Sequence, residues 1–442
     1  MNRASLVGHL LELLSEVDVV SQAPDRITAE FFHARKYLGS HDRRFVAESL
    51  YGMIRHRRLI ESILEQYCAS SPHHAAIGAR GVKALPLYAV FAMAVEQEAA
   101  ASISESINSR WCMTFPSVPL GAFLQWVSGV PPAQQYPPAS STALGILYSF
   151  QDWIVDEWRG QVGDEVEKML QSFNVSARVT LRVNLARASR IECQGRLLEE
   201  GIETLPTEFS PSGLVATRRF SLQSSRAFRD GWIELQDEAS QIVSLIADPK
   251  PGQSVIDACA GAGGKSLHLA DLMQGKGSLL AIDIEEKRLA ELRNRATRAG
   301  IRCLTLMQGS VTQTHKALPQ ADVVLVDAPC SGVGTIRRNP WFKWSVTPEL
   351  VERQASVQSS ILDSSAQLVR RGGNLVYCTC SLVRQENEDV VRKFLDSHAE
   401  FEMFDPAGIA QQYRLQPEGM YIKLYPHRHS TDGFFIARMI RS

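Results

Sequence analysis

From about Gln236 onward, short apolar runs of β-prone residues alternate regularly with longer segments of helical periodicity. The clearest apolar runs are SVIDACA (254–260), SLLAIDI (278–284), ADVVLVDAP (321–329) and NLVYCTCSL (374–382). They are separated by helical segments such as 285–300 and 347–373, the second of which we expect Gly372 and Gly373 to end. This alternation predicts an α/β fold with a doubly wound, largely parallel, Rossmann-like sheet, closed by strands at 421–426 and 433–441.

The rest of the chain predicts further domains, because 442 residues exceed what one hydrophobic core usually serves. Residues 1–130 have helical periodicity throughout, and the proline-rich stretch 131–140 predicts a linker. Residues 141–235 combine short helices with strands at RVTLRVNLA (178–186) and IETLPTEF (202–209), which predicts a small α/β subdomain. The sheet domain then occupies 236–442.

Composition narrows the possible classes of protein. A formal net charge of −1 gives no global attraction to a polyanion, so any RNA surface must arise from local clustering. The eight cysteines are scattered, which is typical of a reduced cytoplasmic protein and not of a disulfide scaffold. Charged side chains interrupt the N-terminal segment and no long apolar run occurs, so we expect neither a signal peptide nor a membrane span. We expect no metal, because the cysteines lack the spacing and partners of a zinc site.

A glycine-rich turn, GAGG (261–264), lies between the first of these strands and a helix. Glycine lets a ligand approach the backbone closely, and the helix N-terminus offers free N–H groups. A phosphate-binding loop would need glycine at Cys259 and a dinucleotide fingerprint would need it at Ser266, so both patterns fail. Asp283 ends the next strand, where a carboxylate can bind a ribose diol or cap the following helix. A nucleoside without pyrophosphate, usually S-adenosylmethionine, therefore fits best.

Two cysteines follow separate strands, Cys330 in VLVDAPCSGVGTIRR and Cys380 in LVYCTCSL. Because ligands lie beyond the carboxyl ends of parallel strands, both thiols would face one cleft. A thiolate that adds to C6 of a pyrimidine makes C5 nucleophilic, so one thiol suits covalent catalysis of methylation and the other is a candidate base. Positive charge from Lys265 would favour the thiolate, although a solvated first-turn lysine is the alternative. Simple packing is the alternative for the cysteines, and we favour it for Cys378.

The segments DACAGAGGK, AIDIEEKRL, VDAPCSGVGTIRRNP and VYCTCSL resemble the motifs of RNA cytosine-5 methyltransferases of the Sun/NOL/NOP family, nearest to its bacterial ribosomal RNA small-subunit methyltransferase B branch. LRVN (181–184), QDEASQ (236–241) and TDGFFIARM (431–439) are similar to further motifs of that family. The resemblance implies a class I methyltransferase sheet preceded by an RNA-recognition subdomain and, more weakly, by an antiterminator-like RNA-binding helical domain. It also implies transfer of a methyl group from S-adenosylmethionine to C5 of a cytosine in RNA. Small-subunit ribosomal RNA, free or in an assembling ribosomal subunit, would be the first substrate and tRNA the second.

The resemblance also assigns roles to individual residues. Cys380 would attack C6, and Cys330 would assist release of the methylated product. Asp327 would hydrogen-bond the cytosine edge or the cofactor, and Asp283 would hold the cofactor ribose. The methionine part would be wrapped by Cys259, Ala260, Gly261, Ala262, Gly263, Gly264 and Lys265. The chain departs from the family where Gly261-Ala262 replaces alanine–proline, and where Ser310 replaces an aspartate expected to contact adenine.

RNA contacts are expected at two places. Arg182 and Asn184 belong to LRVN, within a stretch (178–230) that has nine arginines, six acidic residues and no lysine. Guanidinium groups bind phosphate and stack on bases, whereas the alternative is a surface held by arginine–glutamate pairs. The segment RRNPWFKW would clamp an unstacked base through Arg337, Arg338, Trp341 and Lys343, with a hydrophobic staple as the alternative.

Two other functions stay open: a catalytically silent RNA-binding ribosome-assembly factor, and a methyltransferase that acts on another atom.

Overall fold

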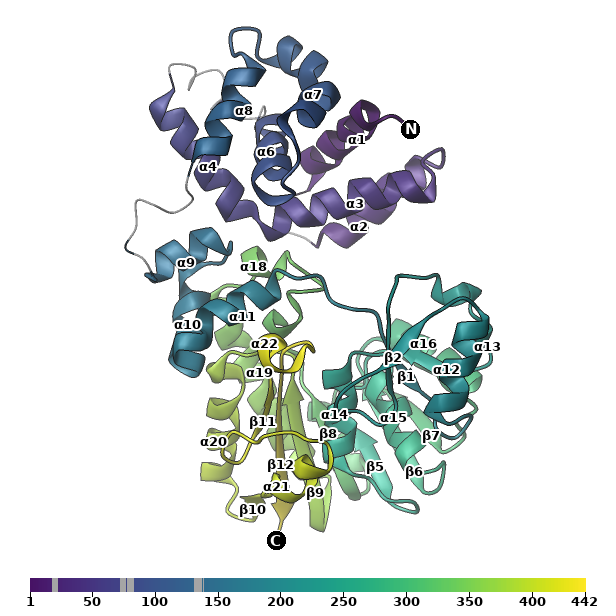
Figure 1. Ribbon diagram of the computed structural model, residues 1–442. Helices are drawn as coiled ribbons and strands as arrows, with labels where there is room; N and C mark the ends of the chain where they lie inside the picture. The colour runs from purple at the N-terminus through teal and green to yellow at the C-terminus, as the bar shows by residue number, and fades with distance from the viewer. Residues whose placement is uncertain (18–22, 72–76, 78–82, 131–136, 138) are drawn as a thin grey trace. The chain divides into compact units, whose positions relative to one another are not determined.

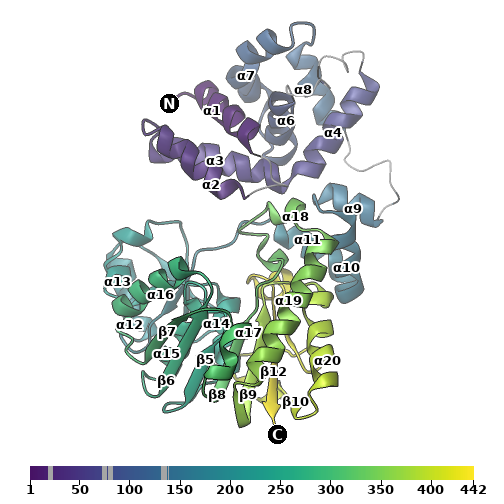
Figure 2. The ribbon, with the colours of Figure 1, turned by 180° about the vertical axis from the view of Figure 1, so that it is seen from behind.

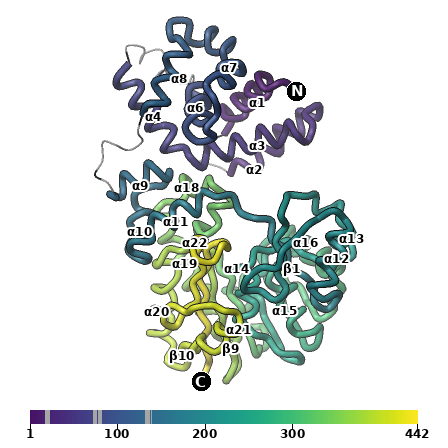
Figure 3. Tube along the Cα trace, viewed as in Figure 1, coloured from purple at the N-terminus to yellow at the C-terminus, as the bar shows by residue number. Residues whose placement is uncertain are grey.

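The computed structural model describes residues 1–17, 23–71, 77, 83–130, 137 and 139–442, which divide into two compact units. The first unit comprises Met1–Val175 and Arg338–Thr347, and the second comprises Ser176–Arg337 and Pro348–Ser442. Figure 3 traces the chain through them. The division lies after Val175 and not near residue 141, because the helices of 141–173 pack with the N-terminal helices. The expected linker 131–140 lies largely outside the described residues.

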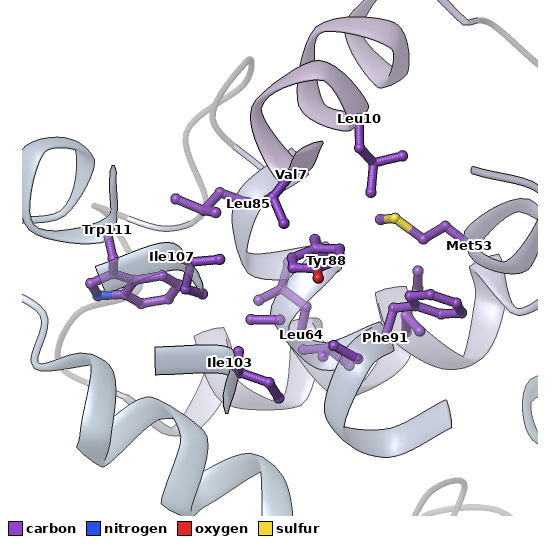
Figure 4. Close-up of a cluster of buried hydrophobic side chains, with 14 of the residues drawn as sticks. Val7, Leu10, Met53, Leu64, Leu85, Tyr88, Phe91, Ile103, Ile107 and Trp111 are labelled. Atoms are coloured by element: carbon purple, nitrogen blue, oxygen red, sulfur yellow. The ribbon is translucent and has the colours of Figure 1, made fainter. Parts of the chain in front are cut away.

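The described residues of the first unit are helical (Figure 1). Its helices are α1 (Arg3–Glu16), α2 (Pro24–Ala34), α3 (Ser40–Arg55), α4 (Arg57–Ser70), α6 (Ala84–Val90), the π-helix η1 (Phe91–Val95), α7 (Ala100–Thr114), α8 (Leu120–Gly129), α9 (Ser141–Leu147), α10 (Asp152–Val162), η2 (Gly163–Glu165), α11 (Val166–Phe173) and α18 (Phe342–Ser345). Apolar faces of several of these helices meet in one core, where Val7, Tyr88 and Phe91 lie together (Figure 4). Trp341 and Trp344 pack against the same core.

The second unit contains the predicted sheet, in the strand order β10-β12-β9-β8-β5-β6-β7 with β11 paired to β12. The strands are β5 (Ser254–Asp257), β6 (Ser278–Asp283), β7 (Leu304–Gln308), β8 (Ala321–Asp327), β9 (Val369–Thr379), β10 (Phe401–Met403), β11 (Ile422–Leu424) and β12 (Phe434–Arg441). Strands β5 to β9 pair in parallel, and the last three pair antiparallel. The chain runs from β5 outward to β7 and then returns to β8 on the other side of β5. The carboxyl ends of β5 and β8 therefore flank a topological switch point, where ligands bind in such sheets.

Helices cover both faces of this sheet. One face carries α14 (Glu238–Ala247), α15 (Gly264–Leu272) and α16 (Glu286–Ala299), and the other carries α17 (Val311–Thr314), α19 (Pro348–Ala366) and α20 (Glu388–Ser397) (Figure 2). Alternate residues of each strand serve the two faces, so that Cys378 packs toward α14 and α15 whereas Tyr377 packs toward α19 and α20. The short helices are η4 (His315–Ala317), η5 (Val333–Thr335), η6 (Arg384–Glu386), α21 (Ala407–Gln412) and α22 (Pro426–His429). Both faces are buried, which explains why the central strands are apolar almost without interruption.

A second sheet is antiparallel and has the order β2-β3-β1-β4. Its elements are β1 (Thr180–Val183), α12 (Arg190–Glu199), β2 (Thr204–Pro206), β3 (Gly213–Ala216), η3 (Leu222–Ser224), α13 (Arg226–Arg229) and β4 (Ile233–Leu235). Helix α12 begins at a capping box, in which Ser189 and Glu192 each bind the other's backbone N–H with a side-chain oxygen. The sequence predicted β1, α12 and β2, but it gave no signal for β3 and β4, which are only four and three residues long.

One predicted helix boundary is wrong. Helix α19 ends at Ala366 and not at Gly372, and strand β9 already begins at Val369. The pairing register between β8 and β9 shifts between Ala321 and Val323, and Gly372 adopts a φ of 71°. The paired glycines therefore allow an irregular start to a strand, because glycine tolerates positive φ at a bulge.

Candidate active site

The residues expected to form the site gather at the carboxyl ends of the parallel strands. Asp283 and Asp327 are the last residues of β6 and β8. Cys380 directly follows β9, and Cys330 lies three residues beyond β8. The predicted site residues of the sheet domain thus lie near the switch point, although they are far apart in sequence.

The two thiols lie close together. Cys330 Sγ is 3.3 Å from Cys380 Sγ, and both side chains are partly buried. The hydrogen bond between the two sulfurs is the largest influence on the pKa of the Cys330 thiol, followed by burial, and together they raise this pKa well above its usual value. The raised pKa keeps the Cys330 thiol protonated at neutral pH, and a protonated thiol is a weak nucleophile.

Lys265 and Asp327 form a partly buried ion pair beside the thiols. Lys265 Nζ donates to Asp327 Oδ2 at 2.7 Å, and Cys378 Sγ donates to Asp327 Oδ1 at 3.4 Å. Burial alone would lower the pKa of Lys265, but the carboxylate of Asp327 outweighs it, and the net shift is upward. Lys265 therefore stays charged and is not the solvated first-turn lysine of the alternative. Cys378 is fully buried, as expected for packing, yet it also orients the carboxylate.

The glycine turn is shaped for close approach of a ligand. Gly261 and Gly263 have φ values of 55° and 84°, which glycine adopts without strain. A Cβ on Gly263 would lie 2.0 Å from Leu292 Cδ1, so this position has no room for a side chain. Arg295 Nη1 donates to the carbonyl of Ala262 at 2.7 Å and holds the turn. The replacement of alanine–proline by Gly261-Ala262 therefore leaves a well-defined turn that begins α15.

The acidic residues around the turn suit a charged nucleoside. Asp283 accepts from the backbone N–H groups of Gly261 and Glu285 at 2.7 and 2.8 Å, one on each carboxylate oxygen. Each oxygen keeps a second lone pair, so a ribose diol can still donate to it. Burial raises the pKa of Asp257 to about 6. Among the described residues its Oδ1 has no hydrogen-bond partner, which suits the ammonium group of a methionine moiety.

The remaining predicted cofactor contacts are less distinctive. Cys259 is almost buried, and burial raises the pKa of its thiol. Ser310 precedes α17, and its Oγ lies 2.7 Å from Thr312 Oγ1. Ile284, which sequence reasoning missed, is 66% exposed immediately after Asp283, although most apolar residues of this sheet are buried. In the sequence, the signal that could have drawn attention to Ile284 is an apolar residue directly after the acidic end of a strand.

The structure gives structural roles to most of the expected RNA contacts in the second unit. Arg182 is buried, with Nε donating to Gln236 at 2.6 Å and Nη1 lying 3.6 Å from Asp271. Asn184 is buried and donates to the carbonyls of Gly231 and Ala299. Arg337 is also buried and donates to two backbone carbonyls of the β11–β12 connection. These side chains are engaged within the protein, so we do not propose them as RNA contacts.

The same correction applies to Lys343, in the first unit. Lys343 Nζ donates to the carbonyls of Arg55 and Tyr148 and to Asn174 Oδ1 at 2.5 to 3.1 Å, and the side chain is fully buried. Burial lowers the pKa of this lysine well below its usual value. Trp341 packs on the helical core, as the alternative of a hydrophobic staple predicted. Of the four residues of RRNPWFKW expected to contact RNA, only Arg338 is exposed.

Replacing Lys343 with alanine is expected to destabilise the first unit by about 3 kcal/mol, because three buried acceptors would lose their donor. Calorimetric unfolding of the full chain should show this transition at lower temperature, with RNA affinity unchanged below it. Lys168→Ala removes an exposed lysine of the same unit and serves as the control. If the Lys343→Ala variant instead unfolds at the wild-type temperature and loses affinity for RNA, Lys343 is an RNA contact after all.

The described residues contain no group of three or more histidine, cysteine, aspartate or glutamate residues arranged to hold a metal ion. None of their helices has both the length and the apolar character needed to cross a membrane.

A largely parallel sheet with a glycine turn after its first strand and an acidic residue at the end of its second is a Rossmann-like, nucleoside-binding arrangement. The family that the chain matches makes this protein a methyltransferase that uses S-adenosylmethionine. Residues 244–440 match the family model described as 16S rRNA methyltransferase RsmB/F, and residues 150–223 match the ferredoxin-like domain of that family. The chain belongs to this family.

Individual relatives agree with this assignment. The chain is 30% identical over 410 residues to the probable ribosomal RNA small subunit methyltransferase B of Synechocystis sp., covering 90% of this chain and 91% of that protein. It is 36% identical over 299 residues to the Bacillus subtilis protein of the same name, covering 66% of each, just under two thirds. The match to the crystal structure of PH0851 covers 100% of this chain and 99% of the PH0851 chain, with 28% sequence identity and a TM-score of 0.76.

Proposed function

We propose that this protein methylates C5 of a cytosine in small-subunit ribosomal RNA through a covalent adduct with Cys380. The observation that carries the proposal is the pair of thiols, 3.3 Å apart, beside the Lys265–Asp327 ion pair. Methylation at nitrogen or at a ribose oxygen needs no thiol nucleophile, because those atoms already carry a lone pair. A paired-thiol site therefore favours carbon methylation over the other methyl acceptors.

The chemistry follows from the weak nucleophilicity of C5. Addition of the Cys380 sulfur to C6 breaks the C5–C6 double bond and places electron density on C5. S-adenosylmethionine, which the glycine turn and Asp283 would hold, would supply the methyl group as a sulfonium; its methyl–sulfur bond would break as the bond to C5 forms, and a neutral thioether would leave. Loss of the C5 proton and expulsion of the Cys380 sulfur then restore the ring. Cys330 lies in sulfur contact with Cys380, where it can exchange protons during this release.

Asp327 and Lys265 suit binding of the cytosine. The carboxylate can accept a hydrogen bond from the exocyclic amino group, which cytosine has and uracil lacks. Lys265 orients that carboxylate, since its ammonium donates to Asp327 Oδ2 at 2.7 Å. The target base must leave its stack to reach this site, at a cost of a few kcal/mol. Ile284, exposed beside the ribose-binding Asp283, suits a contact with adenine.

The relatives named ribosomal RNA small subunit methyltransferase B support ribosomal RNA as the substrate, ahead of tRNA. The test is to incubate the purified protein with S-adenosylmethionine labelled in its methyl group and with small-subunit ribosomal RNA, small-subunit particles or tRNA. Nucleoside analysis by mass spectrometry should find label as 5-methylcytidine, and bisulfite sequencing should map it to one position of the ribosomal RNA. Label on another nucleoside would disprove the carbon chemistry. Absence of label from every substrate would leave the silent assembly factor.

A further inference from the structure

Glu386 is a fully buried carboxylate that touches both cysteine loops. It accepts hydrogen bonds from Ser331 N at 2.7 Å, from Ser331 Oγ and Ser381 Oγ at 2.5 Å each, and from Gln358 Nε2 at 3.1 Å. Ser331 directly follows Cys330, and Ser381 directly follows Cys380. One side chain thus connects the residues next to the two thiols.

The surrounding contacts strengthen this connection. Asn387 accepts from Thr379 Oγ1 at 2.6 Å and donates to the carbonyl of Ser381 at 3.0 Å, on either side of Cys380. Tyr377, in the same strand, donates through its hydroxyl to the carbonyl of Glu386 at 2.6 Å. Gln358 of α19 also donates to the carbonyl of Pro329, just before Cys330. Both cysteine loops are therefore fixed to the same short segment.

A side chain that joins two loops by hydrogen bonds, as Glu386 does, does not need a charge to stabilise the fold. Burying a carboxylate is costly unless it is paired, and Glu386 forms no ion pair with any described residue. Its four donors are all neutral, and two of them are hydroxyls that a smaller polar group could satisfy. The charge also faces Cys330, where it opposes ionisation of that thiol.

We propose that Glu386 is a positioning residue that holds the Cys330 and Cys380 loops together, so that both sulfurs reach the same pyrimidine ring. The proposal rests on the proposed function for its catalytic meaning, but the distance between the two loops is a property of the protein alone. It can therefore be tested without RNA.

The first measurement is the rate at which a mild oxidant, diamide, joins Cys330 and Cys380 as a disulfide in the full chain, with the bond located by peptide mass spectrometry. In the wild-type protein the sulfurs need little movement to react. Glu386→Leu removes both acceptor oxygens, and with them all four hydrogen bonds, at similar volume, and we expect the Cys330–Cys380 reaction to slow at least about tenfold. Glu386→Gln retains one acceptor oxygen and should give a smaller decrease, which keeps the test valid if the leucine variant does not fold.

Glu388→Leu is the matched control. Glu388 lies two residues away on the same segment and forms an ion pair with Lys423, so its loss tests general destabilisation of this region. We expect disulfide formation at the wild-type rate in this variant. An equal rate in the Glu386 variants and the wild type, or an equal decrease in the Glu388 control, would overturn the proposal.

The second measurement is methylation kinetics. A misplacement of about 1 Å at a catalytic group can cost up to about 100-fold, so kcat of Glu386→Leu should fall between about 10-fold and 100-fold. Binding of S-adenosylmethionine, measured by calorimetry, should be unchanged, because the carboxylate contacts no part of the glycine turn. A fall in cofactor affinity as large as the fall in kcat would indicate a general structural role and overturn the proposal. If the wild-type protein methylates no RNA, the proposed function fails, while the disulfide result still decides the role of Glu386.

Discussion

Replacing Cys380 with alanine is expected to reduce methylation of RNA by about 10⁴-fold or more, because no other group can form the bond to C6. The thiol at 3.3 Å, Cys330, does not replace it, since burial and the contact with Cys380 raise the pKa of Cys330. Removing Cys380 also removes that contact, but burial still opposes ionisation of Cys330. The measurement is transfer of labelled methyl groups to small-subunit ribosomal RNA, together with a denaturing gel for covalent protein–RNA species, which should be absent.

Cys303→Ala is the control for this variant. Cys303 immediately precedes β7, at the opposite end of the strand from the site, and it is only partly buried. It should leave methylation unchanged, which separates the loss of one nucleophile from a general effect of losing a thiol. Methylation by Cys380→Ala within tenfold of the wild-type rate would contradict the assignment of Cys380 as the nucleophile.

The sheet was predictable from the sequence because its strands are buried on both faces. Runs such as ADVVLVDAP are apolar at successive positions, and helix α16 ends at Gly300, which has a positive φ. The parallel arrangement then fixed the site, since each strand ends at the same edge. Cys330, Cys380 and Asp283 were predicted to lie at that edge, whereas their individual roles came from the resemblance to the family's motifs.

Side-chain burial was not predictable in the same way. Arg182 and Lys343 lie in segments whose composition is typical of an RNA-binding surface. In the structure, however, Arg182 pairs with Asp271 and Lys343 donates to Asn174, and both partners are distant in sequence. No local pattern distinguishes a lysine that donates to buried carbonyls from one that meets a phosphate. The role of Glu386 was hidden for the same reason, because Ser331 lies 55 residues before it in the chain.

Replacing Cys330 with alanine is expected to have the opposite effect to loss of Cys380 on the covalent intermediate. Cys380 still adds to C6, but release of the product loses the group that exchanges protons next to the leaving sulfur. The adduct should therefore accumulate, as a protein–RNA species that survives denaturation and that carries the transferred methyl group. Turnover should fall about 10²-fold to 10⁴-fold, the usual range for loss of an acid or base.

The double variant Cys330→Ala/Cys380→Ala decides which thiol forms the bond. If Cys380 is the nucleophile, the double variant forms no adduct, whereas Cys330→Ala alone forms it with RNA and S-adenosylmethionine. Adduct in Cys380→Ala and none in Cys330→Ala would exchange the two roles. That result would conflict with the geometry, because Glu386 faces Cys330 and disfavours its thiolate, while Lys265 and Asp327 lie against the strand that presents Cys380. The unequal charge around the two sulfurs therefore supports the proposed roles, in which Cys380 attacks C6 and Cys330 assists release.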